Sequence, residues 1–198
     1  MAVMTTGRGQ TPAEAPRRAD ARRNRDHLLA VARAAFNEAG PDASMVEIAR
    51  RAGVGQGTLY RHFPTRAALL RAVLADRIDT LCRQAAELSD TASADDALDA
   101  WLRLFLAHAR LNQGLAGAFM VEGPEASVAD CHQTIMNTAA DLLGRAQQTG
   151  TARQGLDPDD LVQLVVGIAL ATAHADGGDQ ADRLLTLALG AVHRTPPT

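Results

Sequence analysis

The chain contains no lysine: all 20 of its basic residues are arginine. We interpret this absence as a bias in genomic base composition more than as a functional choice. Aromatic residues make up only 3% of the 198 residues, and alternating runs of β-branched residues are few. Alanine and leucine are abundant instead. The sequence therefore predicts an all-α chain, long enough for one or two domains that each bury a hydrophobic core.

Cysteine and long apolar runs are also scarce. The two cysteines, Cys82 and Cys131, form no C-x-x-C pair. We expect them to be small buried residues in a reducing cytosol, with redox sensing as the alternative. The N-terminus lacks the apolar segment of a signal peptide, and the apolar stretch 161–175 is too short and interrupted to span a bilayer. These absences predict a cytoplasmic protein without a membrane partner.

Patterns typical of enzymes are absent as well. The sequence has no H-E-x-x-H, no repeated Glu-x-x-His pair and no glycine-rich phosphate loop after a strand. Asp130, Cys131 and His132 are adjacent, but neighbouring helical residues diverge in direction, which disfavours a metal site. We expect no catalytic residues, metal or cofactor. An enzyme, or a helical small-molecule-binding protein without DNA binding, is the alternative.

Charge is unevenly distributed, although the formal net charge is only −3. Residues 1–66 hold 11 arginines and 6 acidic residues, whereas residues 67–198 hold 9 arginines and 17 acidic residues. A basic N-terminal part suits DNA, and an acidic remainder limits non-specific binding. Five arginines lie between residues 17 and 25. They indicate an arm on the phosphate backbone or minor groove, with Arg22 and Arg23 as candidate contacts, or else a solvated helix start.

Residues 44–63 are the most informative stretch: S-M-V-E-I-A-R-R-A-G-V-G-Q-G-T-L-Y-R-H-F. Ser44 and Glu47 have the spacing of a capping box, which predicts a helix that starts at Met45. Gly53 ends this helix, because the residue after a helix often needs a positive φ. A second short helix follows. Two short helices around a glycine turn are the arrangement that places one helix in the major groove of DNA.

The second helix of this motif is expected over residues 56–62. Leu59 and Phe63 lie four residues apart and face inward, so the remaining side chains point outward. Glutamine and arginine can pair bidentately with bases, whereas hydroxyl, imidazole and guanidinium groups also bind phosphates. The predicted base contacts are Gln56, Gly57, Thr58 and Arg61, and the predicted phosphate contacts include Tyr60, His62 and Arg66. From spacing alone, two helices that simply pack in a bundle are the alternative.

The run from Leu28 to Leu74 resembles the N-terminal domain of the tetracycline-repressor (TetR) family of bacterial regulators. The likeness is strongest in G-V-G-Q-G-T-L-Y-R-H-F-P-T-R-A-A-L-L, residues 53–70. It implies that Gln56, Gly57 and Thr58 face bases, and that Ser44, Tyr60, His62 and Arg66 face phosphates. The chain departs from many members at Gly55, where they have serine or threonine as helix cap. Glycine is only a slightly poorer cap.

The sequence predicts three parts: a disordered tail over residues 1–19, a helix-turn-helix DNA-binding domain over 20–70, and a helical effector-binding and dimerisation domain over 71–198. About nine helices are expected. Their predicted ranges are 21–39, 45–52, 56–62, 65–88, 95–109, 115–121, 126–148, 158–175 and 180–193. Ser93 marks the start of the fifth helix, and Asp157 followed by Pro158 marks the start of the eighth. The helix over 65–88 connects the two domains and so links an effector pocket to the DNA-binding helices.

The last two predicted helices carry more apolar side chains than one face can bury. Burial within one domain is one explanation. A two-fold four-helix interface explains both helices, and it sets two recognition helices about 34–36 Å apart, as a palindromic operator requires. The resemblance implies the same homodimer. The predicted interface residues are Leu161, Leu164, Val165, Ile168, Leu184, Leu187 and Val192.

The second domain also holds the candidate effector pocket, because apolar helices with a few polar groups suit a small molecule. Residues 97–110 are similar to the C-terminal domain of one regulator subgroup. For each single residue core packing is the alternative. The candidate set is Trp101, Phe105, His108, Phe119, Met120, His132, Met136 and His174. The resemblance implies a repressor released by an unidentified effector, with a transcriptional activator as the alternative.

Overall fold

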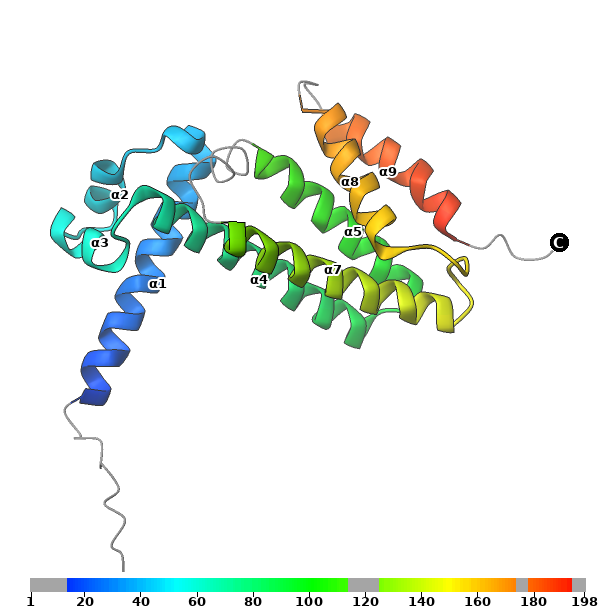
Figure 1. Ribbon diagram of the computed structural model, residues 1–198, viewed down its shortest axis with the longest axis horizontal. Coiled ribbons are helices and arrows are strands. Elements are labelled where there is room, and N and C mark those ends of the chain that lie inside the picture. Colours follow the sequence, from blue (N-terminus) through cyan, green and yellow to red (C-terminus); the bar gives the residue numbers. More distant parts are fainter. Residues whose placement is uncertain (1–13, 114–124, 174–177, 194–198) are drawn as a thin grey trace, which may run out of the picture. The chain divides into compact units, whose positions relative to one another are not determined.

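The computed structural model describes residues 14–113, 125–173 and 178–193, and over these ranges the regular elements are helices (Figure 1). One isolated antiparallel bridge joins Ala152 and His193. The all-α prediction is confirmed. The predicted helix over 115–121 lies outside the described residues. The elements are α1 (Glu14–Ala39), η1 (Gly40–Asp42), α2 (Met45–Arg51), α3 (Gln56–His62), α4 (Arg66–Thr91), α5 (Ala94–Leu111), α7 (Glu125–Gln148), α8 (Pro158–Ala171) and α9 (Gly178–Val192).

The chain divides into two compact units between Leu69 and Leu70, so α4 runs across the boundary. The first unit contains α1, η1, α2, α3 and the first turn of α4. Helix α1 begins at Glu14, so residues 14–19 of the predicted tail are helical. Alanine and arginine are strong helix formers, and Pro16 is tolerated in the first turn of a helix. The rest of the predicted tail, residues 1–13, lies outside the described residues.

The core of the first unit forms where α1, α2 and α3 meet. Helix α1 presents an apolar stripe at helical spacing, and α2 and α3 each add their inward residues. Leu28, Ile48 and Leu59 are completely buried, one from each helix. The other buried residues of these helices are Leu29, Ala32, Ala35, Phe36 and Ala49, with Phe63 just after α3. Helix α1 packs against α2 and α2 packs against α3, so this small core positions α3.

The second unit is a bundle in which α5 packs against α7, α8 and α9, and α8 packs beside α9 (Figure 1). Trp101 of α5 is completely buried and stacks on Phe105, with ring centroids 5.5 Å apart and an interplanar angle of 7°. Leucine and alanine from all four helices complete the core. None of the helices over the described ranges is both long and apolar enough to cross a membrane.

Two predicted helix starts are confirmed by their caps. The hydroxyl of Ser93 accepts a hydrogen bond from the Asp96 backbone N–H at 3.3 Å and caps α5. The carboxylate of Asp157 accepts from the Asp159 N–H at 2.8 Å and caps α8. Pro158 follows in the first turn of α8, where its missing N–H costs no hydrogen bond.

Candidate nucleic-acid interface

The turn between α2 and α3 is held by backbone hydrogen bonds and one left-handed residue. Gly53 has φ +66°, as predicted from its place after the helix. Its N–H donates to the Arg50 carbonyl at 3.1 Å, and the Val54 N–H donates to the Ala49 carbonyl at 3.1 Å. Gly55 is extended and forms the N-cap of α3. These contacts fix the direction in which α3 leaves α2.

The start of α2 differs from the predicted capping box. Ser44 is the N-cap, but its side chain makes no capping hydrogen bond. Glu47 instead accepts from Arg50 Nε at 2.7 Å and Arg51 Nε at 2.8 Å. Hydrogen bonds from a guanidinium to a carboxylate are stronger than those from a neutral amide, which explains the exchange. The exposed Ser44 hydroxyl is therefore not used to cap α2.

The Glu47 carboxylate lies at the centre of a charged network on α2. Hydrogen bonds from Arg50 and then Arg51 lower its pKa to about 2. Arg51 also donates from Nη1 to Glu38 of α1 at 2.6 Å, so the network ties α2 to α1. Both arginines are thus committed to acidic partners.

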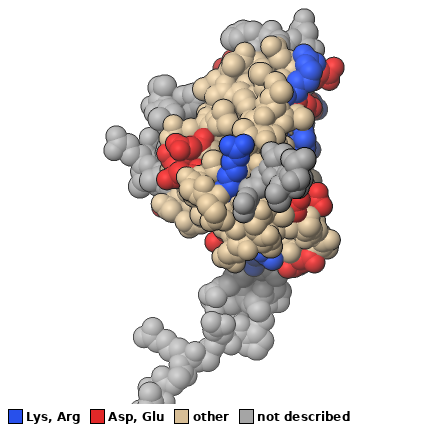
Figure 2. All heavy atoms as spheres, turned by 90° about the vertical axis from the view of Figure 1, so that its right-hand side faces the viewer, with Lys and Arg blue, Asp and Glu red and all other residues tan. Residues whose placement is uncertain are grey.

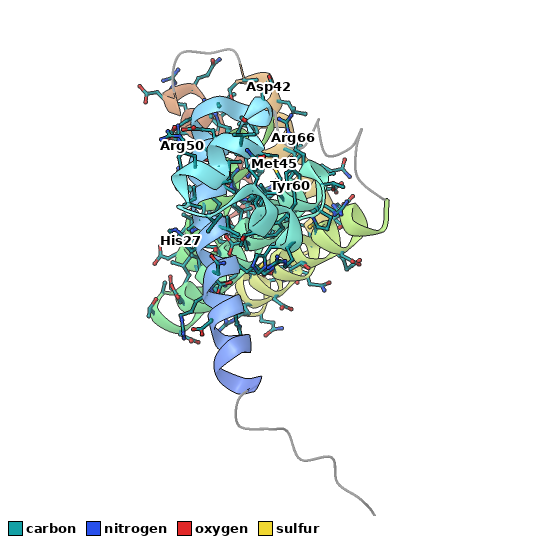
Figure 3. The ribbon with its side chains drawn as sticks, turned by 90° about the vertical axis from the view of Figure 1, so that its left-hand side faces the viewer. His27, Asp42, Met45, Arg50, Tyr60 and Arg66 are labelled. Atoms are coloured by element: carbon teal, nitrogen blue, oxygen red, sulfur yellow. The ribbon has the colours of Figure 1, made fainter. Side chains whose placement is uncertain are left out.

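Helix α3 has the two faces that the sequence predicts. Leu59 is 0% and Phe63 is 2% exposed, whereas Tyr60 is 43% exposed. Figure 3 shows Tyr60 of α3 and Met45 at the start of α2 on the side turned to the viewer. Among the described residues, no hydrogen bond or ion pair engages a polar side chain of this helix. The exposed residues are Gln56, Gly57, Tyr60 and Arg61, and the partly exposed ones are Thr58 and His62.

The predicted phosphate contacts outside α3 lie in different surroundings. Arg66 is the first residue of α4 and is partly exposed. Arg22 and Arg23 are both exposed on α1, and Arg23 pairs with Asp20 one turn earlier. An exposed pair of this kind is worth little, so a phosphate can compete for Arg23.

The predicted dimer residues divide into two sets by their burial within the protomer. Helix α8 turns one apolar stripe into the core of its own unit and another outward. Leu164 is 46% and Leu187 is 74% exposed, while Leu184 is half-buried against the core. Sequence reasoning missed Leu170, which is 61% exposed. The residues buried in the core of the unit are Leu161, Val165, Ile168 and Val192.

Figure 2 shows much uncharged surface on the side of the molecule turned to the viewer, with arginine and acidic side chains scattered over it. The exposed large apolar residues of the second unit are concentrated on α8 and α9: Leu164, Val166, Leu170 and Leu187. Only Leu111 of this unit joins them from another described helix. The sequence shows that the adjacent positions 164 and 165 point to different sides of α8, but not which of them faces the core.

The described candidate pocket residues line neither of two open grooves of the second unit. Trp101 and Phe105 are core residues of α5, and Met136 packs against the same core. His132 is exposed on α7, apart from these core residues. Two open grooves of about 280 and 290 Å³ run beside α4 and α7, and both are lined by Ser89, Leu142 and Arg145. Three predicted pocket residues, Phe119, Met120 and His174, lie outside the described residues.

His108 lies in a polar cluster that the sequence did not reveal. Arg77 of α4 is buried and donates to the side-chain oxygen of Asn112, which ends α5. The Asn112 amide donates to the His108 carbonyl at 2.7 Å. Burial, and then the charge of Arg77, lowers the pKa of His108 to about 4. The imidazole is therefore neutral at pH 7. An arginine within the apolar face of α4 was the available signal.

The cysteines are half-buried and unpaired, not core residues. Thr138 donates a hydrogen bond to Cys82 Sγ at 3.2 Å. Burial, followed by the charges of Asp130 and Asp79, raises the pKa of the Cys131 thiol. A raised pKa disfavours the reactive thiolate. Over the described part of the chain, no group of three histidine, cysteine or acidic side chains is placed to hold a metal ion.

Two protein-family matches together cover most of the chain. Residues 28–73 match the family of bacterial regulatory proteins described as tetR, which covers α2, α3 and part of α1 and α4. Residues 93–192 match the C-terminal domain of transcriptional regulators described as SbtR-like. The first match contains the helix-turn-helix, and the second contains α5, α7, α8 and α9.

Solved structures and curated proteins give the same picture. The TetR transcriptional regulator SCO0520 from Streptomyces coelicolor is 37% identical, with a TM-score of 0.75 over 86% of this chain and 99% of that one. A TetR regulator from Mycobacterium vanbaalenii is 32% identical, with a TM-score of 0.72 over 89% and 99%. The HTH-type regulator SAB2452 of Staphylococcus aureus is 35% identical over 79 residues, which span 39% of this chain and 43% of that protein.

Proposed function

Because the chain belongs to the TetR family of transcriptional regulators and is a DNA-binding regulator, we propose that it is a repressor. It binds a palindromic operator as a homodimer and leaves it when a small molecule binds. The regulator binds its operator on chromosomal DNA in the cytoplasm.

The polar face of α3 carries this proposal. Leu59 and Phe63 anchor the helix, so its exposed side chains project from a fixed frame. Preorganised side chains lose less entropy on binding than mobile ones. The Gln56 amide suits an adenine edge, and Gly57 lets the backbone approach the groove. Tyr60 and His62 donate to phosphates on either side and set the register of the helix.

Dimerisation is proposed through the outward stripes of α8 and α9. Leu164, Leu170 and Leu187 expose apolar surface to water in the monomer. Exposed apolar surface of this kind marks interaction sites. An isologous contact between two copies covers these side chains on both protomers. It also supplies the second recognition helix that a palindrome requires.

Release by an effector is proposed to act through α4, because this helix belongs to both units. A ligand that prefers one tilt of α4 over another shifts the population of the dimer away from the spacing that fits DNA. The effector site is assigned to the helices of the second unit, without a residue set.

The test combines selection with assembly. The purified protein is used to select sequences from a random duplex library, and sedimentation gives its mass in solution. We expect an enriched palindrome and a dimer. A strictly monomeric protein, or a selection without enrichment at low salt, contradicts the proposal. A reporter with the selected site across its promoter then separates repression from activation, since a repressor lowers expression and an activator raises it.

A further inference from the structure

One arginine of the first unit is fixed against the recognition helix by an aromatic ring. The guanidinium carbon of Arg25, on α1, lies 5.3 Å from the centroid of the Phe63 ring. Phe63 is the C-cap of α3 and is buried. A cation over an aromatic face is attracted by the quadrupole of the ring. Arg25 is therefore held at the end of α3.

The guanidinium N–H groups of Arg25 make no hydrogen bond or ion pair within the described part of the chain. Arg23 pairs with Asp20, and Arg50 and Arg51 pair with Glu47. Among the described residues, Arg25 makes neither a hydrogen bond nor an ion pair, and its side chain is exposed. Arg22, Arg61 and Arg66 are also without acidic partners there, but no ring holds them in place. Arg25 thus combines a fixed position with an uncompensated charge.

Stacking leaves the guanidinium suited to a phosphate. A cation–π contact uses no N–H donor of the guanidinium, so these donors stay available and can match phosphate oxygens bidentately. His62, next to Phe63 in the chain, and Tyr60, three residues before it, are assigned to phosphates. A DNA strand bound by Tyr60 and His62 would run near the C-terminal end of α3, where Phe63 holds Arg25.

We propose that Arg25 is a prepositioned phosphate-binding residue of the DNA interface, held in place by Phe63. The proposal rests on the DNA-binding function stated above. It assigns to Arg25 an interaction with the DNA backbone, not with bases. Arg25 consequently contributes equally to operator and to random duplex.

The experiment measures the affinity of full-length wild type and Arg25→Gln for a random 30-bp duplex and for the selected operator, from about 50 to 200 mM salt. The slope of log K against log salt is negative. For each phosphate that the variant no longer neutralises, its magnitude decreases by about 0.9. We expect affinity for both duplexes to fall by a similar factor, about tenfold at low salt. Arg83→Gln, which removes an exposed arginine of the second unit, is the matched control and leaves both slopes unchanged.

Two further variants separate charge from position. Arg25→Lys keeps the cation but loses the planar fork, so the salt slope stays near that of wild type while affinity falls by less than in Arg25→Gln. Phe63→Leu keeps an apolar side chain but removes the ring, and it should lower the affinity for both duplexes. Thermal unfolding of this variant, measured in parallel, shows whether it is folded. Circular dichroism of Arg25→Gln confirms that the helices are intact.

Two results overturn the proposal. If Arg25→Gln has the same affinity and the same salt slope as wild type, Arg25 binds no phosphate. A loss of affinity restricted to the operator, with an unchanged slope, shows that Arg25 only supports the packing of α3. If wild type itself binds neither duplex, the proposed function fails instead, and the two failures are thereby distinguished.

Discussion

The imidazole Nε2 of His193 lies 2.8 Å from Asp99 Oδ1, and this contact joins the end of α9 to α5. Backbone contacts reinforce the junction, since the Arg153 N–H donates to the Val192 carbonyl at 2.9 Å. The C-terminal end of α9, the helix that carries Leu187, is therefore anchored within its own protomer. Such an anchor gives the proposed dimer surface a fixed shape before a partner arrives.

Removing the carboxylate should loosen this junction. Asp99→Ala is expected to cost about 0.5–1 kcal/mol, because both side chains are roughly one-third exposed and solvent screens the pair. For a chain of this length that corresponds to a fall of about 1–4 °C in the unfolding midpoint. Calorimetry measures it. Asp141→Ala is the matched control, since Asp141 is also mid-helix but exposed and without an ion pair in the described ranges. Equal midpoints for the two variants contradict the assigned role.

His108 predicts a pH dependence of stability. Its folded pKa is lowered from 6.5 to about 4, so the unfolded chain takes up a proton first as pH falls. Protonation of the unfolded state favours unfolding, and stability is therefore lost between pH 6.5 and 4. In His108→Gln this loss should shrink. Urea midpoints at pH 7, 5.5 and 4 test it, with the exposed His132→Gln as control. Parallel losses in wild type and His108→Gln count against the assignment.

The features predicted from sequence are those that local chemistry decides. Gly53, Ser93 and Asp157 mark helix ends because a positive φ or a side-chain cap depends on a few neighbouring residues. The inward positions of Leu59 and Phe63 follow from helical spacing alone. The helix-turn-helix was readable for this reason, and so was the polar face of α3.

The features that could not be predicted from the sequence depend mostly on packing between distant segments. Helix α8 is apolar on nearly every side, so its sequence does not state which stripe faces α5, and Val165 and Leu164 were not separated. Arg77 and Asn112 are 35 residues apart, and only the fold brings them together beside His108. The capping box failed locally, because two arginines compete for Glu47 more strongly than a backbone N–H.

Base and phosphate contacts on α3 should respond differently to mutation. Gln56→Ala is expected to lose about 1–3 kcal/mol on the operator and little on random duplex, because a bidentate base contact carries discrimination. Tyr60→Ala should weaken both duplexes by the same factor, because a phosphate contact carries no sequence information. Fluorescence anisotropy on both duplexes measures the four affinities. The division of roles is rejected when both variants lose equally on operator and random DNA.

Leu187 is the most exposed large apolar side chain of the described residues, at 74%. Leu187→Glu places a like charge on each side of the proposed two-fold interface, so the dimer should dissociate at micromolar protein. Operator affinity then falls because one recognition helix is missing from each complex. Sedimentation and anisotropy measure the two effects. Leu111→Glu, on an exposed leucine at the end of α5, is the matched control and should stay dimeric. A dimeric Leu187→Glu protein argues against this interface.

Two glycines of the motif should respond in opposite ways to the same methyl group. Gly53 has φ +66°, and no atom lies within 4 Å of an added Cβ, so the cost of Gly53→Ala is backbone strain of about 1–2 kcal/mol. Gly57 lies within α3 with equally open space, and Gly57→Ala should stabilise the first unit by about 0.5–1 kcal/mol.

DNA binding should invert this order. Gly53→Ala leaves the face of α3 unchanged, so operator affinity stays near wild type wherever the protein is folded. The Gly57→Ala methyl stands on the surface that approaches the groove and should reduce operator affinity, although the protein itself is more stable. Urea unfolding and anisotropy, measured on the same samples, give both quantities. If Gly57→Ala binds the operator as tightly as wild type, the backbone of α3 does not approach the bases at this position.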